Sequence, residues 1–225
     1  ENENKPRIVS QLSCVFLQKL GLQPVQNCQY YKEANIRRKK YRKEKKEKQE
    51  KKEEKRGKNP FHQVYSDTCG PMSPESLMGS KYFTSFIAEQ CRYSWVKFHK
   101  SRDEIASLTE DISVHLTNIY GKKMEILYSD NAPEYKGGKM KEVARRKEFV
   151  QKFTIPYNPQ MNSIAERYNL TVLSMSRTLL LNARAPEYLW AEAVSMANFR
   201  NRLPTSTLGV SPYESLNGTK PDLGT

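Results

Sequence analysis

The sequence has few of the residues that build disulfide frameworks or zinc sites. Its 225 residues include four cysteines and three histidines, and no two cysteines form a C-x-x-C pair. We therefore expect free thiols rather than a disulfide framework or a zinc knuckle. Because His62, His99 and His115 lie far apart in the sequence, we assign none of them to a metal.

Long apolar runs are also absent. No stretch approaches the roughly 18 uncharged apolar residues needed to cross a bilayer, and the first residues lack a basic segment followed by an apolar one. We expect a soluble intracellular protein, cytoplasmic and nuclear, with no membrane partner. At this length the chain can bury one core of about 100 to 150 residues.

Positive charge is concentrated in one tract. The chain carries +13, and residues 32–58 alone hold 15 basic and six acidic residues, or +9. The tract has almost no apolar residues, so we expect a basic linker or solvated helix. A nucleic-acid or nuclear-import role centred on Arg37–Lys43 competes with a solubilising charge run. Residues 1–31 carry a modest apolar pattern that predicts one short helical segment.

From Phe61 onward, the pattern alternates between strands and helices. Aromatic and β-branched residues predict three consecutive strands at 61–67, 81–90 and 93–100, which suggests an antiparallel meander. A helix that ends at Gly121 follows, because apolar residues recur at steps of three and four: Ile105, Leu108, Ile112, Leu116 and Ile119.

The second half predicts two more strands and three helices. The ranges are a strand at 124–130, a basic helix at 139–149, a strand at 150–156, a long helix at 164–182 and a last helix at 187–202. This order predicts an α/β domain over 59–203, with a mixed five-stranded sheet flanked by helices. Residues 204–225 are expected to form a loop-like C-terminal extension.

Two predicted strands end in the same tripeptide, Tyr-Ser-Asp, at Asp67 and Asp130. If these strands are parallel neighbours, both carboxylates emerge at the carboxyl edge of the sheet, where α/β folds place their sites. Two anions this close repel unless a cation lies between them, and Mg²⁺ or Mn²⁺ suits an all-oxygen site. The alternative is that both residues simply open β-turns.

A third acid, Glu166, lies near the start of the long helix, with 35 residues between it and Asp130. This spacing is weak evidence alone, and Ser163 with Glu166 also matches a capping box. The wider context resembles the integrase catalytic core of copia-type retrotransposons, in the retroviral integrase superfamily. The resemblance extends over residues 61–220. It rests on five motifs in this order: YSDTCGPM, KYFTSFIAEQCRYSWVKF, YSDNAPEYKG, PYNPQMNSIAERYN and the stretch that ends in NRLP.

The resemblance implies a ribonuclease-H-like fold in which Asp67, Asp130 and Glu166 are the catalytic, metal-binding acids. Such enzymes use two Mg²⁺ or Mn²⁺ ions, roughly 3.5 to 4 Å apart, for in-line displacement at phosphorus. Asp67 is then the natural bridging ligand. The implied function is DNA integration: a polynucleotidyl transferase trims the 3′ ends of the element and joins them to target DNA. A homo-oligomer is implied as well.

Polar and basic residues near these acids are candidates for binding DNA, because such side chains commonly contact phosphates and base edges. Ordinary surface polarity is the alternative. The candidates are Asn131, Asn158, Gln160, Asn162, Arg167, Asn169, Lys136 and Lys139, with Lys141, Arg145, Arg146 and Lys147 extending the basic stretch.

The sequence departs from this family at several points. Ala132 and Pro133 stand where glycines are usual, Ser163 replaces a glycine before Glu166, and Glu89 and Gln90 replace acids after the second strand.

The usual His/His/Cys/Cys zinc module has no counterpart in residues 1–60, which contain two cysteines and no histidine. We expect no zinc, a degenerate segment at 1–31, and a fragment or remnant of a longer polyprotein. A decayed or domesticated remnant that binds nucleic acid or protein is the alternative function, and a nuclease that only cleaves is another.

Overall fold

The computed structural model describes residues 59–154 and 163–223. The predictions for residues 1–31 and 32–58 lie outside the described residues. So do Asn158, Gln160 and Asn162 among the candidate DNA contacts.

A mixed sheet of five strands forms the centre of the molecule, in the order β3-β2-β1-β4-β5. The first three strands form an antiparallel meander, whereas β4 runs parallel to β1 and β5 runs parallel to β4. The strand bounds are Gln63–Cys69 (β1), Tyr82–Ala88 (β2), Ser94–His99 (β3), Ile126–Ser129 (β4) and Val150–Phe153 (β5). The predicted mixed five-stranded sheet is therefore confirmed.

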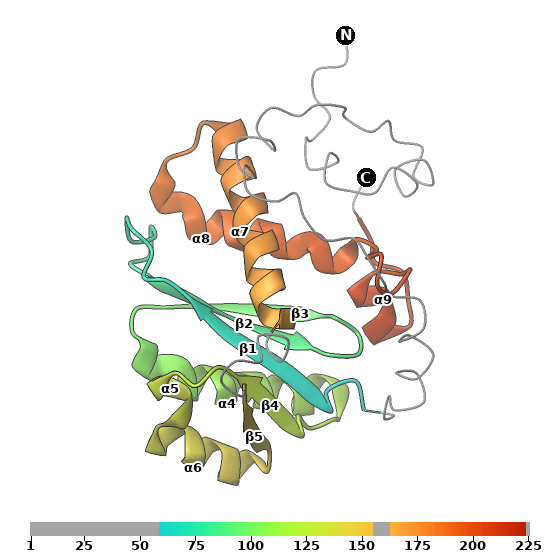
Figure 1. The fold of residues 1–225 in the computed structure, drawn as a ribbon. Coiled ribbons are helices and arrows are strands. Elements are labelled where there is room, and N and C mark those ends of the chain that lie inside the picture. The colour runs from blue at the N-terminus through green and yellow to red at the C-terminus, as the bar shows by residue number, and fades with distance from the viewer. Residues whose placement is uncertain (1–58, 155–162, 224–225) are drawn as a thin grey trace.

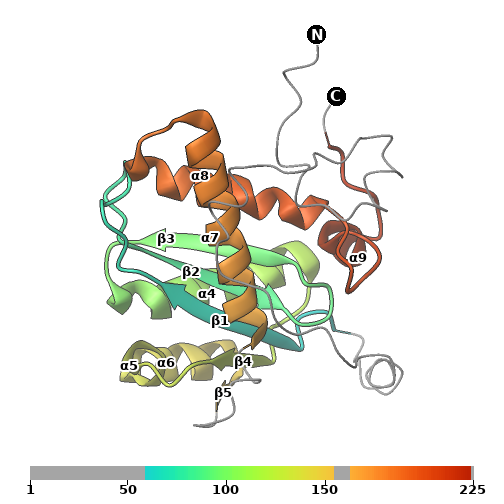
Figure 2. The same cartoon turned by 45° about the horizontal axis from the view of Figure 1, so that its top comes forward.

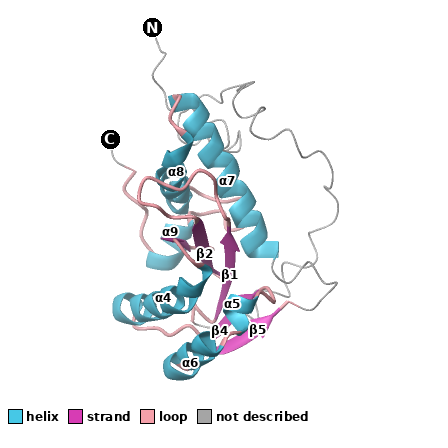
Figure 3. Ribbon diagram, turned by 90° about the vertical axis from the view of Figure 1, so that its left-hand side faces the viewer, coloured by secondary structure: helices cyan, strands magenta, loops and turns pink. Residues whose placement is uncertain are grey.

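Helices cover both faces of this sheet (Figures 1 and 3). One face carries α4 (Ile105–Tyr120), α5 (Pro133–Lys136) and α6 (Gly138–Lys147), and the other carries α7 (Ser163–Ala183) and α8 (Trp190–Ala197). Each layer buries its own apolar cluster against the sheet. The interior strand β2 is therefore buried at six consecutive positions, Phe83 to Ala88.

The helix α7 crosses the face of β1 and β2 (Figure 2). Its apolar positions Tyr168, Val172 and Met175 are buried against that face together with Trp190 of α8. The spacing of four and three residues places these side chains on one stripe of the helix. This packing fixes the first turns of α7 above the carboxyl half of β1.

Several predicted elements differ from those observed. The last helix is divided into the 3-10 turns η3 (Glu187–Leu189) and η4 (Asn198–Arg202) on either side of α8. The tail is not only loop, because α9 (Pro212–Asn217) begins after Ser211, whose hydroxyl accepts a hydrogen bond from the Glu214 backbone N–H. The short helix α5 and the turn η2 (Arg102–Glu104) were not predicted.

In the described residues, no helix is long and apolar enough to span a bilayer.

The apolar stripe of α4 is shorter than the sequence predicts. Ile105, Ile112 and Leu116 are buried, but Ile119 is 62% exposed. The helix ends one residue later at Tyr120 and is capped by Gly121, which adopts φ 62° and donates its backbone N–H to the Thr117 carbonyl. The last turn still contacts the core, but it does so through Tyr120, whose ring packs against buried Phe61, so Ile119 is left on the solvent side of that turn.

Two alanine substitutions on α4 test this packing. Leu116→Ala should lower the free energy of unfolding by about 2 to 5 kcal/mol, because it leaves a cavity in a fully buried layer. Ile119→Ala should change it by less than about 0.5 kcal/mol, as expected for an exposed position. Urea denaturation of both variants measures the difference. Equal losses would show that Ile119 belongs to the core after all.

Candidate functional site

The parallel pairing of β1 with β4 brings the two aspartates together. The paired residues are Gln63 with Ile126, Val64 with Leu127 and Tyr65 with Tyr128. Continued by two residues, this register sets Asp67 opposite Asp130, on strands that lie about 4.8 Å apart. The shared Tyr-Ser-Asp tripeptide thus occupies equivalent positions on neighbouring strands. Both acids lie at the carboxyl edge of this parallel pair, as the sequence predicted.

The helix α7 supplies the third side of the site. Asn169 lies on its inner face, 3% exposed, and its Nδ2 donates a hydrogen bond of 2.9 Å to Oδ2 of Asp67. Glu166 lies three residues earlier, on the same side of the helix, and is exposed. Ser163 is already part of the first turn, where its hydroxyl accepts a hydrogen bond from Arg167 Nη2 at 3.1 Å.

The pKa of Asp67 is raised by burial and by the charges of both other acids. Burial raises its pKa from 3.8 to about 6, with a further rise from the negative charge of Asp130 and a smaller one from Glu166. The hydrogen bond from Asn169 opposes this rise because it favours the ionised carboxylate. Negative charge at the site is therefore only partly compensated by the protein.

The donor set fits a hard divalent cation. Carboxylate and amide oxygens are the ligands that Mg²⁺ and Mn²⁺ accept, and a cation would relieve the repulsion that raises the pKa of Asp67. Oδ1 of Asn169 is also the one buried side-chain polar atom in the described residues without a hydrogen-bond partner. An uncompensated acceptor beside a carboxylate adds to this fit.

The three acids do not form a closed ligand cage. Within residues 59–154 and 163–223, no three His, Cys, Asp or Glu side chains lie close enough to hold one metal ion together. Asp67 and Asp130 are brought together by the strand register, while Glu166 remains exposed at the start of α7. The shared metal site of all three acids therefore stays a prediction.

The segment after Asp130 is ordered by its own hydrogen bonds. Oδ1 of Asp130 accepts the Ala132 backbone N–H at 3.1 Å, and Asn131 Nδ2 donates to the Thr154 carbonyl at 2.6 Å. Pro133 then occupies the first turn of α5, where its missing N–H costs nothing. Ala132 and Pro133, which stand where the family usually has glycines, thus form the start of helix α5.

The other candidate DNA contacts fall into two groups. Lys136, Lys139 and Arg167 are exposed, as is Asn131, and Lys136 lies over the ring of Phe153 at 5.6 Å. Asn169 differs because it is buried and bound to Asp67. Sequence reasoning chose Asn169 for its amide type and missed this contact. Asn169 lies three residues after Glu166 in the sequence, and this helical spacing could have predicted that it faces the acids.

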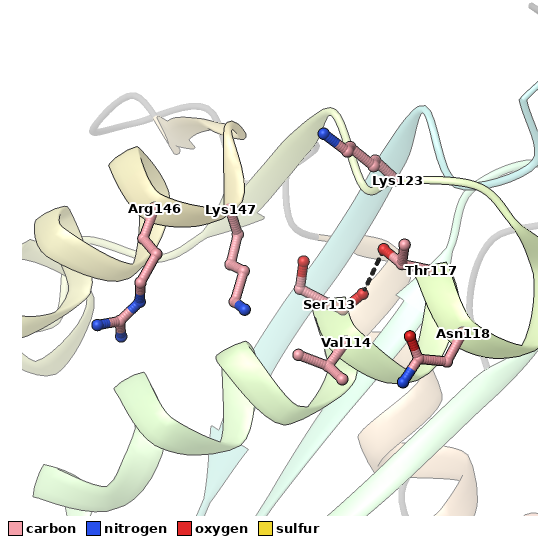
Figure 4. Close-up of a pocket in the computed structure, with 7 residues that line it drawn as sticks. All are labelled: Ser113, Val114, Thr117, Asn118, Lys123, Arg146 and Lys147. Atoms are coloured by element: carbon pink, nitrogen blue, oxygen red, sulfur yellow. Dashed lines mark hydrogen bonds between the residues drawn. The ribbon is translucent and has the colours of Figure 1, made fainter.

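A separate basic groove lies between α4 and α6 (Figure 4). Its volume is about 350 Å³, and its lining includes Val114, Lys123, Arg146 and Lys147. Glu110 accepts contacts from Arg146 at 2.5 Å and Lys147 at 3.2 Å, so part of this charge is compensated. Lys123 precedes β4 whereas Asp130 follows it, so the groove lies at the opposite edge of the sheet from the acids.

The histidines and cysteines of the described residues have ordinary partners. His62 contacts Glu125, His99 bonds Thr84 and the Ser101 carbonyl, and His115 packs near Trp95. Cys69 and Cys91 are free thiols, as predicted, and burial raises the pKa of each to about 11.

Comparison with known proteins finds a sequence relative in a mobile element. The chain is 36% identical over 146 residues to the retrovirus-related Pol polyprotein from transposon TNT 1-94 of Nicotiana tabacum; this match covers 64% of the chain and 11% of that polyprotein. The chain thus spans about a ninth of that relative's length. No protein-family model matches the chain.

Two solved structures share the fold. One is a chain of the simian T-cell lymphotropic virus intasome in complex with the PP2A regulatory subunit B56 gamma, with a TM-score of 0.57 and 18% identity over 76% of this chain and 58% of that one. The other is the HTLV-2 integrase catalytic core domain in complex with magnesium, in a trimeric form, with a TM-score of 0.54 and 15% identity over 72% of this chain and all of that one.

The raised pKa of Asp67 predicts a pH-dependent effect of Asp67→Asn in metal-free buffer. A carboxyl with a raised folded-state pKa stabilises the fold below about pH 4, and that contribution is lost as pH rises through 6. At pH 8 the variant should be more stable than wild type by about 1 to 2 kcal/mol, and the difference should shrink at pH 4. Thermal and urea unfolding at both pH values measure it.

Asp111→Asn is the matched control, since Asp111 is exposed on α4. It should change the free energy of unfolding by less than about 0.5 kcal/mol, as expected for an exposed position. A destabilised Asp67→Asn at pH 8 would contradict the electrostatic description of the site.

Proposed function

We propose that this chain, a homologue of a retrotransposon Pol polyprotein with the fold of a retroviral integrase catalytic core, is a divalent-metal-dependent polynucleotidyl transferase that acts on DNA. The observation that carries the proposal is the parallel register of β1 and β4, which sets Asp67 opposite Asp130. Glu166 enters from α7 within electrostatic range of Asp67.

Asp67, Asp130 and Glu166 are the side chains that would hold Mg²⁺ or Mn²⁺. The magnesium complex of the HTLV-2 core domain supports this choice of cation. Bound divalent ions would supply electrostatic stabilisation for the attacking and leaving oxygens of an in-line displacement. No role for zinc is proposed.

The chain's own residues would prepare this reaction. Asn169 holds Oδ2 of Asp67 through Nδ2, which orients the carboxylate. The bond from Asn131 to Thr154 ties the segment after Asp130 to the end of β5. The acids are thereby held on secondary-structure elements, which limits the reorganisation needed when substrate arrives.

DNA would be held by the polar and basic side chains around the acids. The exposed members are Asn131, Lys136, Lys139 and Arg167. The same role is proposed for Asn158, Gln160 and Asn162. The reaction would trim the 3′ ends of element DNA and join them to target DNA. We also propose a homo-oligomer, since one structural neighbour is an intasome and the other a trimeric form. A location in the cytoplasm and nucleus is part of the same proposal.

One observation favours a second function, that of a remnant without catalysis that binds nucleic acid or protein. Glu166 is exposed, and the three acids do not form a closed ligand cage in the described residues. In this alternative, the fold and its basic surface persist while metal binding has been lost. The two functions differ in whether well-folded protein gives any reaction product.

Glu166→Gln tests the proposed role of Glu166 as a metal ligand. The substrate is a pre-cut DNA end in the presence of Mn²⁺, and joined products are resolved from shortened ones by size. We expect joining to fall by at least about 100-fold, because Gln keeps the size and shape of the side chain but removes an anionic ligand. Glu142→Gln, at an exposed position on α6, is the control and should retain full activity.

The products distinguish the alternatives. Joining by Glu166→Gln at the wild-type rate would exclude Glu166 from the site. Shortened products without joined ones would indicate a nuclease. Folded wild-type protein that yields neither would support the remnant.

A further inference from the structure

Tyr135 joins the segment of one aspartate to the strand of the other. It lies on α5, five residues after Asp130, and is fully buried. Its hydroxyl lies 2.7 Å from Oγ of Ser66 and 3.3 Å from Oγ1 of Thr68. These two residues flank Asp67 on β1.

Strand geometry explains why Tyr135 does not touch Asp67 itself. Successive side chains of a strand point to opposite faces, so Ser66 and Thr68 face α5 while Asp67 faces α7. The strand β1 is therefore hydrogen-bonded on both faces. Tyr135 bonds the neighbours of Asp67 on one face, and Asn169 bonds the Asp67 carboxylate on the other.

Two further contacts fix α5 in place. The Tyr135 carbonyl accepts a hydrogen bond of 2.7 Å from Gln151 Nε2 on β5. Glu134 forms an ion pair with Arg102, and its side chain is 7% exposed. Figure 3 shows α5 beside β1 and β5. The helix therefore has anchors on β1, β5 and η2, so movement of the Asp130 segment would strain several bonds together.

The hydroxyl of Tyr135 belongs to a chain of buried polar groups. Thr68 Oγ1 lies 2.8 Å from Thr84 Oγ1, which lies 2.9 Å from His99 Nε2, and His99 Nδ1 lies 2.7 Å from the Ser101 carbonyl. A carbonyl only accepts, so Nδ1 carries the proton and Nε2 accepts from Thr84.

The direction of every other bond then follows. Thr68 donates to Thr84, Tyr135 donates to Thr68, and Ser66 donates to Tyr135. The hydroxyls of Tyr135, Thr68 and Thr84 then each accept one hydrogen bond and donate one, which favours one fixed arrangement of strands β1, β2 and β3.

We propose that Tyr135 is a positioning residue that fixes the segment carrying Asp130 against strand β1, and so sets the spacing of Asp67 and Asp130 before any metal binds. The consequence for catalysis rests on the proposed function. The structural tie does not, because it can be measured in metal-free protein.

The first experiment compares amide hydrogen exchange of Tyr135→Phe and Thr84→Val in the full chain without metal. Phe keeps the ring and removes only the hydroxyl. Thr84→Val removes a hydroxyl from the same polar chain, but one bonded to Thr68 and His99 rather than to Tyr135.

We expect exchange in residues 130–137 to rise about tenfold or more in Tyr135→Phe only, while β2 remains protected in both variants. Unchanged exchange in 130–137, or an equal rise in both variants, would overturn the proposal.

The second experiment measures Mn²⁺ affinity by calorimetry and the kinetics of DNA joining. Loss of a group that orients metal ligands weakens metal binding by about 10- to 100-fold. Tyr135→Phe should therefore raise the Kd for Mn²⁺ at least about tenfold and lower kcat, with KM for the DNA end unchanged. A mere loss of stability would leave the Mn²⁺ affinity of the folded protein unchanged.

The two proposals fail in different ways. A Tyr135→Phe variant with loosened exchange but wild-type Mn²⁺ affinity would overturn the positioning role. Wild-type protein that binds no Mn²⁺ would count against the proposed function alone, since the exchange experiment contains no metal and tests the tie independently.

Discussion

The parallel pairing of β1 with β4 is the constraint on which the site depends. It sets Asp67 opposite Asp130 on neighbouring strands, so two like charges are forced together at the edge of a buried sheet. Burial and this repulsion raise the pKa of Asp67 to about 6. A fold that keeps such a pair gives up stability there, as sites built for function commonly do. A bound cation would offset this local loss of stability.

The two faces of strand β1 make different polar contacts. Asp67 faces α7, where Asn169 orients it, and Ser66 and Thr68 face α5, where Tyr135 binds both. Buried hydroxyls on a central strand are costly unless they are paired, and here each one is. The hydrogen bonds through Thr84 to His99 continue this network from β1 across β2 to β3. The geometry at Asp67 is thus determined from both layers of the fold.

Local patterns predicted most of the fold and part of the site. Strand alternation, helical spacing and the Gly121 stop located the main elements, and the repeated Tyr-Ser-Asp tripeptide marked Asp67 and Asp130. Contacts between distant segments were beyond such patterns: Tyr135 meets Ser66 across 69 positions, and Asn169 meets Asp67 across 102. Ile119 was misplaced because apolar spacing alone does not reveal that Tyr120, and not Ile119, meets the core in the last turn of α4. The short helices α5 and α9 contain too few residues for a periodic pattern.

The most direct measurement is a crystal structure of the wild-type protein soaked in Mn²⁺, with the anomalous signal used to locate the metal. The account predicts Mn²⁺ at the carboxyl edge of β1 and β4, with oxygens of Asp67 and Asp130 about 2.0 to 2.3 Å away and Glu166 turned toward the ion. Ordered carboxylates at that edge without bound metal, at a concentration that saturates related sites, would contradict it.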